Sequence, residues 1–170
     1  MLKLYNKFDP IGRCLSHWRN REVKREVIGN LLDIACGDNR LVRSYRGSGK
    51  GIDIQAFQNV DLVVNDFSKI PFPDQSFDTV TIVASLNYFP NATNVLTEIR
   101  RILADPCRLI ITMPNSFLIK YWLKIRDPKA YRLFMSRSEI VKIVVNSGFK
   151  ILDSKRFMLG LNRLYVCTKS

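Results

Sequence analysis

The strongest constraint on how this chain folds is a series of short apolar runs that alternate with segments of helical periodicity. Each run is rich in β-branched residues and is apolar at successive positions, which is typical of strands that are covered on both faces of a sheet. These predicted strands span residues 30–35, 51–54, 60–64, 77–84 and 108–112. The pattern therefore predicts an α/β fold built on a parallel sheet that helices cover.

Two helices have legible ends. The first begins after Asn91, a plausible N-cap, and we expect Asp105-Pro106 to end it. The second starts near Ser138 and stops at Gly148. A third segment, residues 17–29, is strongly charged and should lie over one edge of the sheet.

The tail predicts a closing strand pair over residues 150–154 and 163–168. We therefore expect a Rossmann-like, open and mostly parallel twisted sheet, with helices on both faces and an antiparallel C-terminal strand. A length of 170 residues suits one domain, residues 1–170, with a single core.

Composition favours a cytoplasmic protein. No apolar run is long enough to cross a bilayer, and the N-terminus lacks the features of a signal peptide. The four cysteines are spaced neither as metal ligands nor as a redox pair, and there is one histidine. We therefore expect reduced thiols and no metal site.

The net charge of +12 leaves two explanations open. It can attract an anionic partner, such as a phosphate-bearing substrate, nucleic acid or membrane headgroups, or it can serve solubility alone.

Three acidic residues stand at the ends of three successive predicted strands. Asp33 precedes a loop of small residues in which Gly37 can adopt a positive φ. Asp53 is placed to accept hydrogen bonds from two ribose hydroxyls, and Asp66 beside Phe67 suits an adenine. Because ligands bind at the carboxyl ends of parallel strands, the three predict a nucleoside site. The alternative is that each aspartate caps a turn.

The motifs around these residues resemble those of class I S-adenosylmethionine-dependent methyltransferases. Residues 32–37, LDIACG, are similar to motif I, and residues 70–78, IPFPDQSFD, to the segment before the fourth strand of that family. Residues 96–103 and 108–111 resemble the helix and strand that follow, so the resemblance covers about residues 30–115. It implies a methyltransferase that uses S-adenosyl-L-methionine and releases S-adenosyl-L-homocysteine.

The resemblance also implies roles for individual residues. The methionine part of the cofactor would lie near Asp33 and the backbone of Ala35, Cys36 and Gly37, with Ala84 and Ser85 on the same side. The ribose would be held by Asp53, beside Ile54, and the adenine by Asp66 and the backbone of Phe67.

The chain departs from the family pattern at three places. Ala35 replaces the usual first glycine, and Asp38-Asn39 replaces Thr-Gly or Ser-Gly, so Asn39 must adopt a glycine's backbone angles or the loop must differ. Only residues 55–59 separate the second and third predicted strands, which reduces the crossover helix to about one turn or moves the strands. An edge left uncovered in this way is available to a partner or, in a homodimer, to a second copy.

Residues around the methyl acceptor are less defined. His17 is a candidate general base, although a lone histidine is more often an ordinary surface residue. Asn87, Tyr88 and Asn115 follow predicted strands and are expected to line the substrate pocket. Residues 1–29 would form a helical cover. Residues 116–136, which mix aromatic and basic side chains, would form a substrate lid; a membrane-surface helix and a core helix are the alternatives.

The leading hypothesis is methyl transfer to a small-molecule or lipid-like acceptor, with an anionic acceptor and peripheral membrane contact both open. One alternative is a nucleic-acid methyltransferase, although the chain has no Asn-Pro-Pro-Tyr motif. The other is an inactive domain that binds only a cofactor or a partner. A nicotinamide dehydrogenase is disfavoured because the G-x-G-x-x-G spacing is absent.

Overall fold

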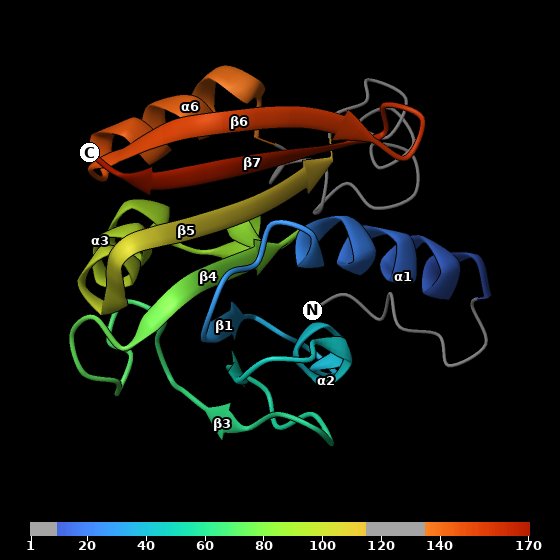
Figure 1. The fold of residues 1–170 in the computed structure, drawn as a ribbon, viewed down its shortest axis with the longest axis horizontal. Coiled ribbons are helices and arrows are strands. Elements are labelled where there is room, and N and C mark those ends of the chain that lie inside the picture. Colours follow the sequence, from blue (N-terminus) through green and yellow to red (C-terminus); the bar gives the residue numbers. More distant parts are fainter. Residues whose placement is uncertain (1–9, 115–134) are drawn as a thin grey trace.

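The computed structural model describes residues 10–114 and 135–170, and it arranges them around one seven-stranded sheet. The strand order is β3-β2-β1-β4-β5-β7-β6, in which β7 is antiparallel to β5 and β6 and the other pairs are parallel (Figure 1). The predicted open sheet with an antiparallel C-terminal strand is confirmed. The strands are β1 (Leu31–Ile34), β2 (Gly49–Asp53), β3 (Leu62–Val63), β4 (Phe77–Val83), β5 (Leu103–Pro114), β6 (Phe149–Phe157) and β7 (Asn162–Lys169).

Helices cover both faces of the sheet. α3 (Ala92–Ile102) and α6 (Arg137–Asn146) bury Val95, Ile99 and Val144 in the larger of two apolar clusters, which also takes Leu32 and Ile34 of β1. α1 (Pro10–Lys24) and α2 (Arg40–Ser44) pack on the other cluster. It contains Leu31, so Asp33, two residues further along β1, faces the same side.

Two helices end earlier than their sequences predict. α1 stops at Lys24 because Ile28 bonds to a neighbouring strand instead: its N–H donates to Thr79 Oγ1 at 3.0 Å, and that hydroxyl donates to the Ile28 carbonyl at 2.7 Å. α3 stops at Ile102 because β5 begins at Leu103, which pairs with Phe77 of β4. The prediction that Asp105-Pro106 ends this helix was therefore wrong.

The connection between β2 and β3 contains no helix. The two strands are parallel, with Ile52 opposite Leu62, and the residues between them form bends and a turn. The crossover helix expected to shrink to about one turn is thus absent, and β3 begins at Leu62 rather than at residue 60. Within residues 10–114 and 135–170 no helix covers this edge, and the apolar side chains of Ile54, Phe57 and Val63 are exposed.

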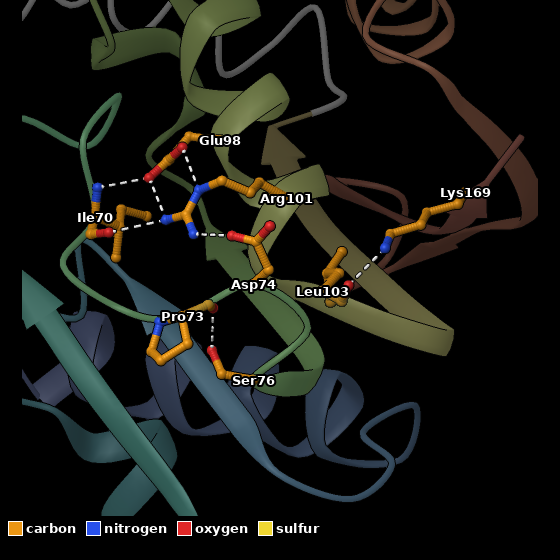
Figure 2. Close-up of polar contacts among 8 residues, drawn as sticks. All are labelled: Ile70, Pro73, Asp74, Ser76, Glu98, Arg101, Leu103 and Lys169. Carbon is orange, nitrogen blue, oxygen red and sulfur yellow. Dashed lines mark hydrogen bonds and ion pairs between the residues drawn. The ribbon is translucent and has the colours of Figure 1, made fainter.

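A loop between β3 and β4 is fixed to α3 by Arg101. Its guanidinium donates to Asp74 at 2.5 Å, to Glu98 at 2.7 Å and to the Ile70 carbonyl at 3.0 Å (Figure 2). Glu98 in turn accepts the Ile70 N–H at 2.9 Å. Residues 70–73 are therefore held as a loop, from which Phe72 packs on the larger core.

None of the helices in the described ranges has the length and apolar character that crossing a membrane requires. Asn115 and nearly all of the predicted lid, residues 116–136, lie outside the described residues, as does the first part of the predicted N-terminal cover.

Candidate functional site

The loop that follows β1 turns tightly at the carboxyl end of the sheet. Ala35, Gly37 and Asn39 all have left-handed backbone angles, with φ of 57°, 55° and 56°. Asn39, which stands where the family pattern has a glycine, therefore adopts the backbone angles that glycine would have there. A non-glycine residue in this region costs about 1–2 kcal/mol, so surrounding contacts must hold the loop.

The Asn39 side chain provides those contacts. Its Nδ2 donates to the Asn59 carbonyl at 2.9 Å and to Asp61 Oδ2 at 2.7 Å, and Asp61 also accepts the Gly51 N–H at 2.7 Å. A β-carbon on Gly51 would collide with Asn39 and with Cys36. The loop after β1 is therefore fastened to the short β2–β3 connection.

Asp33 is the most perturbed acid of the site. Its carboxyl group is buried and accepts a hydrogen bond from the Thr81 hydroxyl of β4 at 2.7 Å. Burial raises the pKa of Asp33 to about 7; Thr81 opposes this rise, the nearby Asp53 adds to it, and the positive charge of Arg19 opposes it. Near neutral pH the group is poised between its two protonation states.

Asp53 ends β2 beside the same loop. Its Oδ2 accepts the Gly37 N–H at 2.9 Å and its Oδ1 accepts the Gln55 N–H at 3.1 Å. Each carboxylate oxygen has two lone pairs, so one acceptor position per oxygen remains for the two hydroxyls of a ribose.

A cavity of about 160 Å³ opens at this point. Its walls combine the β1 end and the following loop with one face of α1. They contain Asp33, Ala35, Cys36, Gly37, Asp38, Arg40, Leu41 and Val83, together with Ser16, Arg19 and Asn20 of α1. Sites for whole cofactors are usually about 300–1,000 Å³, so this cavity by itself accounts for only part of a cofactor site.

Cys36 contributes an inert thiol to these walls. Burial, together with the charges of Asp33 and Asp53, raises the pKa of Cys36, which keeps the sulfur protonated.

Asp66 and Phe67 lie apart from this cavity. Asp66 is exposed, and its two oxygens accept the Ser68 N–H at 2.8 Å and the Ser68 hydroxyl at 2.6 Å, which lowers the pKa of Asp66. The Phe67 ring is buried and packs on Phe89, with 5.2 Å between ring centroids. The structure thus brings Asp33 and Asp53 to the loop after β1. Asp66 lies outside this group, three residues beyond the end of β3.

The end of β4 holds the remaining predicted residues. Ala84 has a φ of 56°, and its N–H donates to the Thr112 carbonyl at 2.9 Å. Ser85 is buried, and its hydroxyl has no hydrogen-bond partner among the described residues. Asn87 and Tyr88 follow in the short 3-10 helix η1 (Leu86–Tyr88), where Tyr88 is exposed.

His17 lines a different cavity, of about 420 Å³, on the neighbouring face of α1. Sequence reasoning missed the α1 residues over the first cavity, because charged helix residues carry no signal of what they face. Thr81 was also missed. The signal for it is its place in β4, where Asp33 and Thr81 are register partners on adjacent parallel strands.

Comparison with known proteins agrees with this geometry. A family model described as "Methyltransferase domain" matches residues 32–111, which span β1 to β5. The demethylmenaquinone methyltransferase of Thermotoga maritima is 26% identical, over 88% of this chain and 86% of its own length. The ubiquinone/menaquinone biosynthesis C-methyltransferase UbiE of Rickettsia prowazekii is 31% identical, over 59% of this chain and 53% of its own length.

A solved structure shares the whole fold. The PH0226 protein of Pyrococcus horikoshii aligns with a TM-score of 0.77 at 17% identity, over 97% of this chain and 94% of its own. The matched domain, the strand order and the acidic residues at the ends of β1 and β2 lead to one conclusion. Residues 32–111 of this chain correspond to the methyltransferase domain of the class I S-adenosylmethionine-dependent enzymes.

Proposed function

We propose that this protein transfers the methyl group of S-adenosylmethionine to a carbon atom of a small, lipid-like acceptor of the quinone-precursor type. The observation that carries the proposal is the placement of two acidic residues at the ends of the adjacent strands β1 and β2. Asp33 lines the cavity, and Asp53 accepts the Gly37 N–H of the loop that borders it. The acceptor class is supported by the names of the relatives, which describe demethylmenaquinone and ubiquinone/menaquinone C-methyltransferases.

The residues at the cavity fit the cofactor. Ionised Asp33 suits the ammonium group of the methionine part, and Asp53 retains acceptor positions for the ribose. The buried Ser85 hydroxyl, unpartnered among the described residues, is satisfied by a polar ligand atom at the end of β4. Asp66 and the Phe67 backbone at the end of β3, with the exposed Ile54, would border the adenine.

The bound cofactor supplies a methyl group that is already activated on a sulfonium. The protein therefore has to orient the acceptor carbon and exclude water. Asn87 and Tyr88 are proposed to border the acceptor, and α1 closes the site through Ser16, Arg19 and Asn20. An electron-rich quinol ring needs less help from a general base than a neutral hydroxyl or amine.

Calorimetry with S-adenosylhomocysteine tests the cofactor site. Asp53→Asn should weaken binding by about tenfold or more, since a charge-assisted contact to a ribose hydroxyl is lost. Asp153→Asn, an exposed residue on β6, is the matched control. If the parent protein binds neither the cofactor nor its demethylated product, the proposal fails and an inactive domain is favoured.

Activity is tested with S-adenosylmethionine and a reduced demethylnaphthoquinone in detergent micelles. The expected product is the ring-methylated quinol, identified by mass spectrometry. RNA and DNA serve as competing acceptors in parallel, and methylation of either in place of the quinol would replace the lipid-like acceptor with nucleic acid.

We also propose a cytoplasmic location with peripheral membrane contact, which the net charge of +12 and the lipid-like acceptor support. We further propose a homodimer, which the exposed apolar side chains at the β2–β3 edge support. Flotation with anionic vesicles should be lost when Lys120, Lys124 and Arg126, outside the described residues, are replaced by Glu. Light scattering gives the oligomeric state.

A further inference from the structure

The cavity of about 420 Å³ between α1 and α2 has a size that suits a small ligand. It is lined by Cys14, Ser16, His17, Asn20, Lys24, Arg40 and Ser44. Ser16, Asn20 and Arg40 also line the smaller cavity beside Asp33, so the two cavities meet along α1. Cys14, His17, Lys24 and Ser44 line this second cavity alone.

The chemistry of its walls is that of an anion site. Two cationic side chains, an imidazole, two hydroxyls and an amide face one space, and none of the described residues that line it is acidic. Lys24 is held in place by a hydrogen bond of 3.1 Å from its Nζ to the Ser44 carbonyl. An ammonium group has three donors, so donors remain for a bound anion.

The surrounding helices keep this region electropositive. Glu22, the acidic residue of α1, pairs with Arg25 at 2.6 Å and lies 3.9 Å from Lys155. Asp38, before α2, pairs with Arg40 at 3.2 Å. Glu22 and Asp38 are thus matched by cations, and Arg21, Lys24 and Arg43 add further positive charge on α1 and α2.

We propose that this cavity binds a phosphate group, either of a free phosphorylated compound or of a lipid headgroup, and that the bound phosphate holds α1 against α2. Lys24 and His17 would reach it from α1, and Arg40 from α2, whereas the Ser44 hydroxyl already donates to the Leu41 carbonyl at 3.0 Å. Phosphate oxygens accept strong charge-assisted hydrogen bonds from lysine and arginine, which suits the donor set.

Such a ligand is coupled to the cofactor through α1, a consequence that rests on the proposed function. Ser16, Arg19 and Asn20 form one wall of the cavity beside Asp33, so a ligand that fixes α1 also fixes that wall. Phosphate would hold the wall in its binding position. It therefore tightens cofactor binding, and the cofactor must tighten phosphate binding by the same factor.

The direct test is a calorimetric titration of the full chain with inorganic phosphate and pyrophosphate at constant ionic strength, without cofactor. Lys24→Gln should weaken binding by about tenfold, whereas Lys24→Arg should retain it. Lys142→Gln, an exposed lysine on α6, is the control with the same charge change. Equal losses in Lys24→Gln and Lys142→Gln, or no binding by the parent protein, overturn the site. Circular dichroism confirms that the variants are folded.

A second arm separates the two sources of phosphate. Competition between pyrophosphate and a soluble short-chain phosphatidic acid for the Lys24-dependent site indicates a headgroup, and binding of pyrophosphate alone indicates a free compound. The coupling is tested by titrating S-adenosylhomocysteine with and without saturating pyrophosphate. Unchanged affinity overturns the coupling, whereas failure of S-adenosylhomocysteine to bind at all overturns the proposed function and leaves the phosphate site standing.

Discussion

The Thr81 hydroxyl donates a hydrogen bond to the carboxyl group of Asp33, with 2.7 Å between the two oxygens, across the parallel pair of β1 and β4. Thr81 opposes a rise in the pKa of Asp33 that burial causes, and the net value is about 7. A threonine that is fully buried in the sheet thus sets the charge of the residue proposed to meet the cofactor's ammonium group.

Cofactor binding should therefore release a proton from Asp33 near neutral pH, because the ammonium group requires the ionised carboxylate. Affinity for S-adenosylhomocysteine should rise by about fivefold between pH 6 and pH 7, as the ionised fraction grows. Calorimetry in buffers of different ionisation enthalpy measures the release. Asp33→Asn should abolish it and weaken binding by about tenfold or more. Proton release that persists in Asp33→Asn would assign it to another group.

Removing Thr81 should move this titration. Thr81→Val keeps the shape of the side chain and removes the hydroxyl, so the pKa of Asp33 should rise further above 7 and the pH range of tight binding should move upward. A carbon-13 carboxyl NMR titration of Asp33 reads the shift directly. An unchanged midpoint would show that the hydrogen bond has no influence on ionisation.

The same perturbation should appear in stability. The folded-state pKa of Asp33 is raised from 3.8 to about 7, so the folded protein binds more protons than the unfolded chain between these values, and this group's contribution to stability declines as pH rises across the window. Relative to the parent protein, Asp33→Asn should gain stability from pH 4 to pH 8, by up to about 4 kcal/mol. Urea denaturation at several pH values measures it, and a difference that does not vary with pH contradicts the shift.

Asn39→Gly should destabilise the protein less than Asn39→Ala does. Both changes lose the hydrogen bonds to Asp61 and to the Asn59 carbonyl, but glycine adopts the φ of 56° without strain. Asn39→Ala should therefore be less stable than Asn39→Gly by about 1 kcal/mol. Thermal unfolding of the pair measures the difference, and equal stability would mean that backbone strain is absent.

Arg101 should stabilise the loop before β4. Arg101→Met removes the hydrogen bonds to Asp74, Glu98 and the Ile70 carbonyl, and we expect a loss of about 1–3 kcal/mol in the free energy of unfolding. Lys142→Met on α6 controls for the loss of one exposed charge. The effect should shrink in acid, because Arg101 lowers the pKa of Glu98 and protonation of Glu98 ends their pairing. Denaturation at pH 7 and at pH 3 checks both expectations.

Much of the fold follows from the sequence alone. β1 and β4 are buried at nearly every position, and their apolar and β-branched residues marked them with boundaries within a residue or so. Contacts with distant elements explain why the predicted ends of α1 and α3 were wrong. β5 starts at Leu103 because it pairs with Phe77, and Ile28 leaves α1 because Thr79 satisfies its backbone groups. α2, with five residues, is too short to show a helical period.

Some residues of the candidate site could also be located from the sequence, and others could not. Asp33, Asp53 and the loop to Asn39 follow strand ends and could be located from spacing. The roles of Thr81 and Arg19 depend on which side of a strand or helix faces Asp33, and that is decided by tertiary packing. The relation of Asn39 to Asp61 and Gly51 is also non-local, since the turn that unites them has no sequence signature of its own.

The helix-free passage from β2 to β3 has a consequence for assembly of the protein. Closing a short loop costs little chain entropy compared with forming a full strand–helix–strand unit, so β3 can join its neighbour as a nearly local event. Because β3 pairs with β2 through two residues and Val63 is exposed, the outermost strand should also be the first part of the sheet to open, which hydrogen exchange would detect.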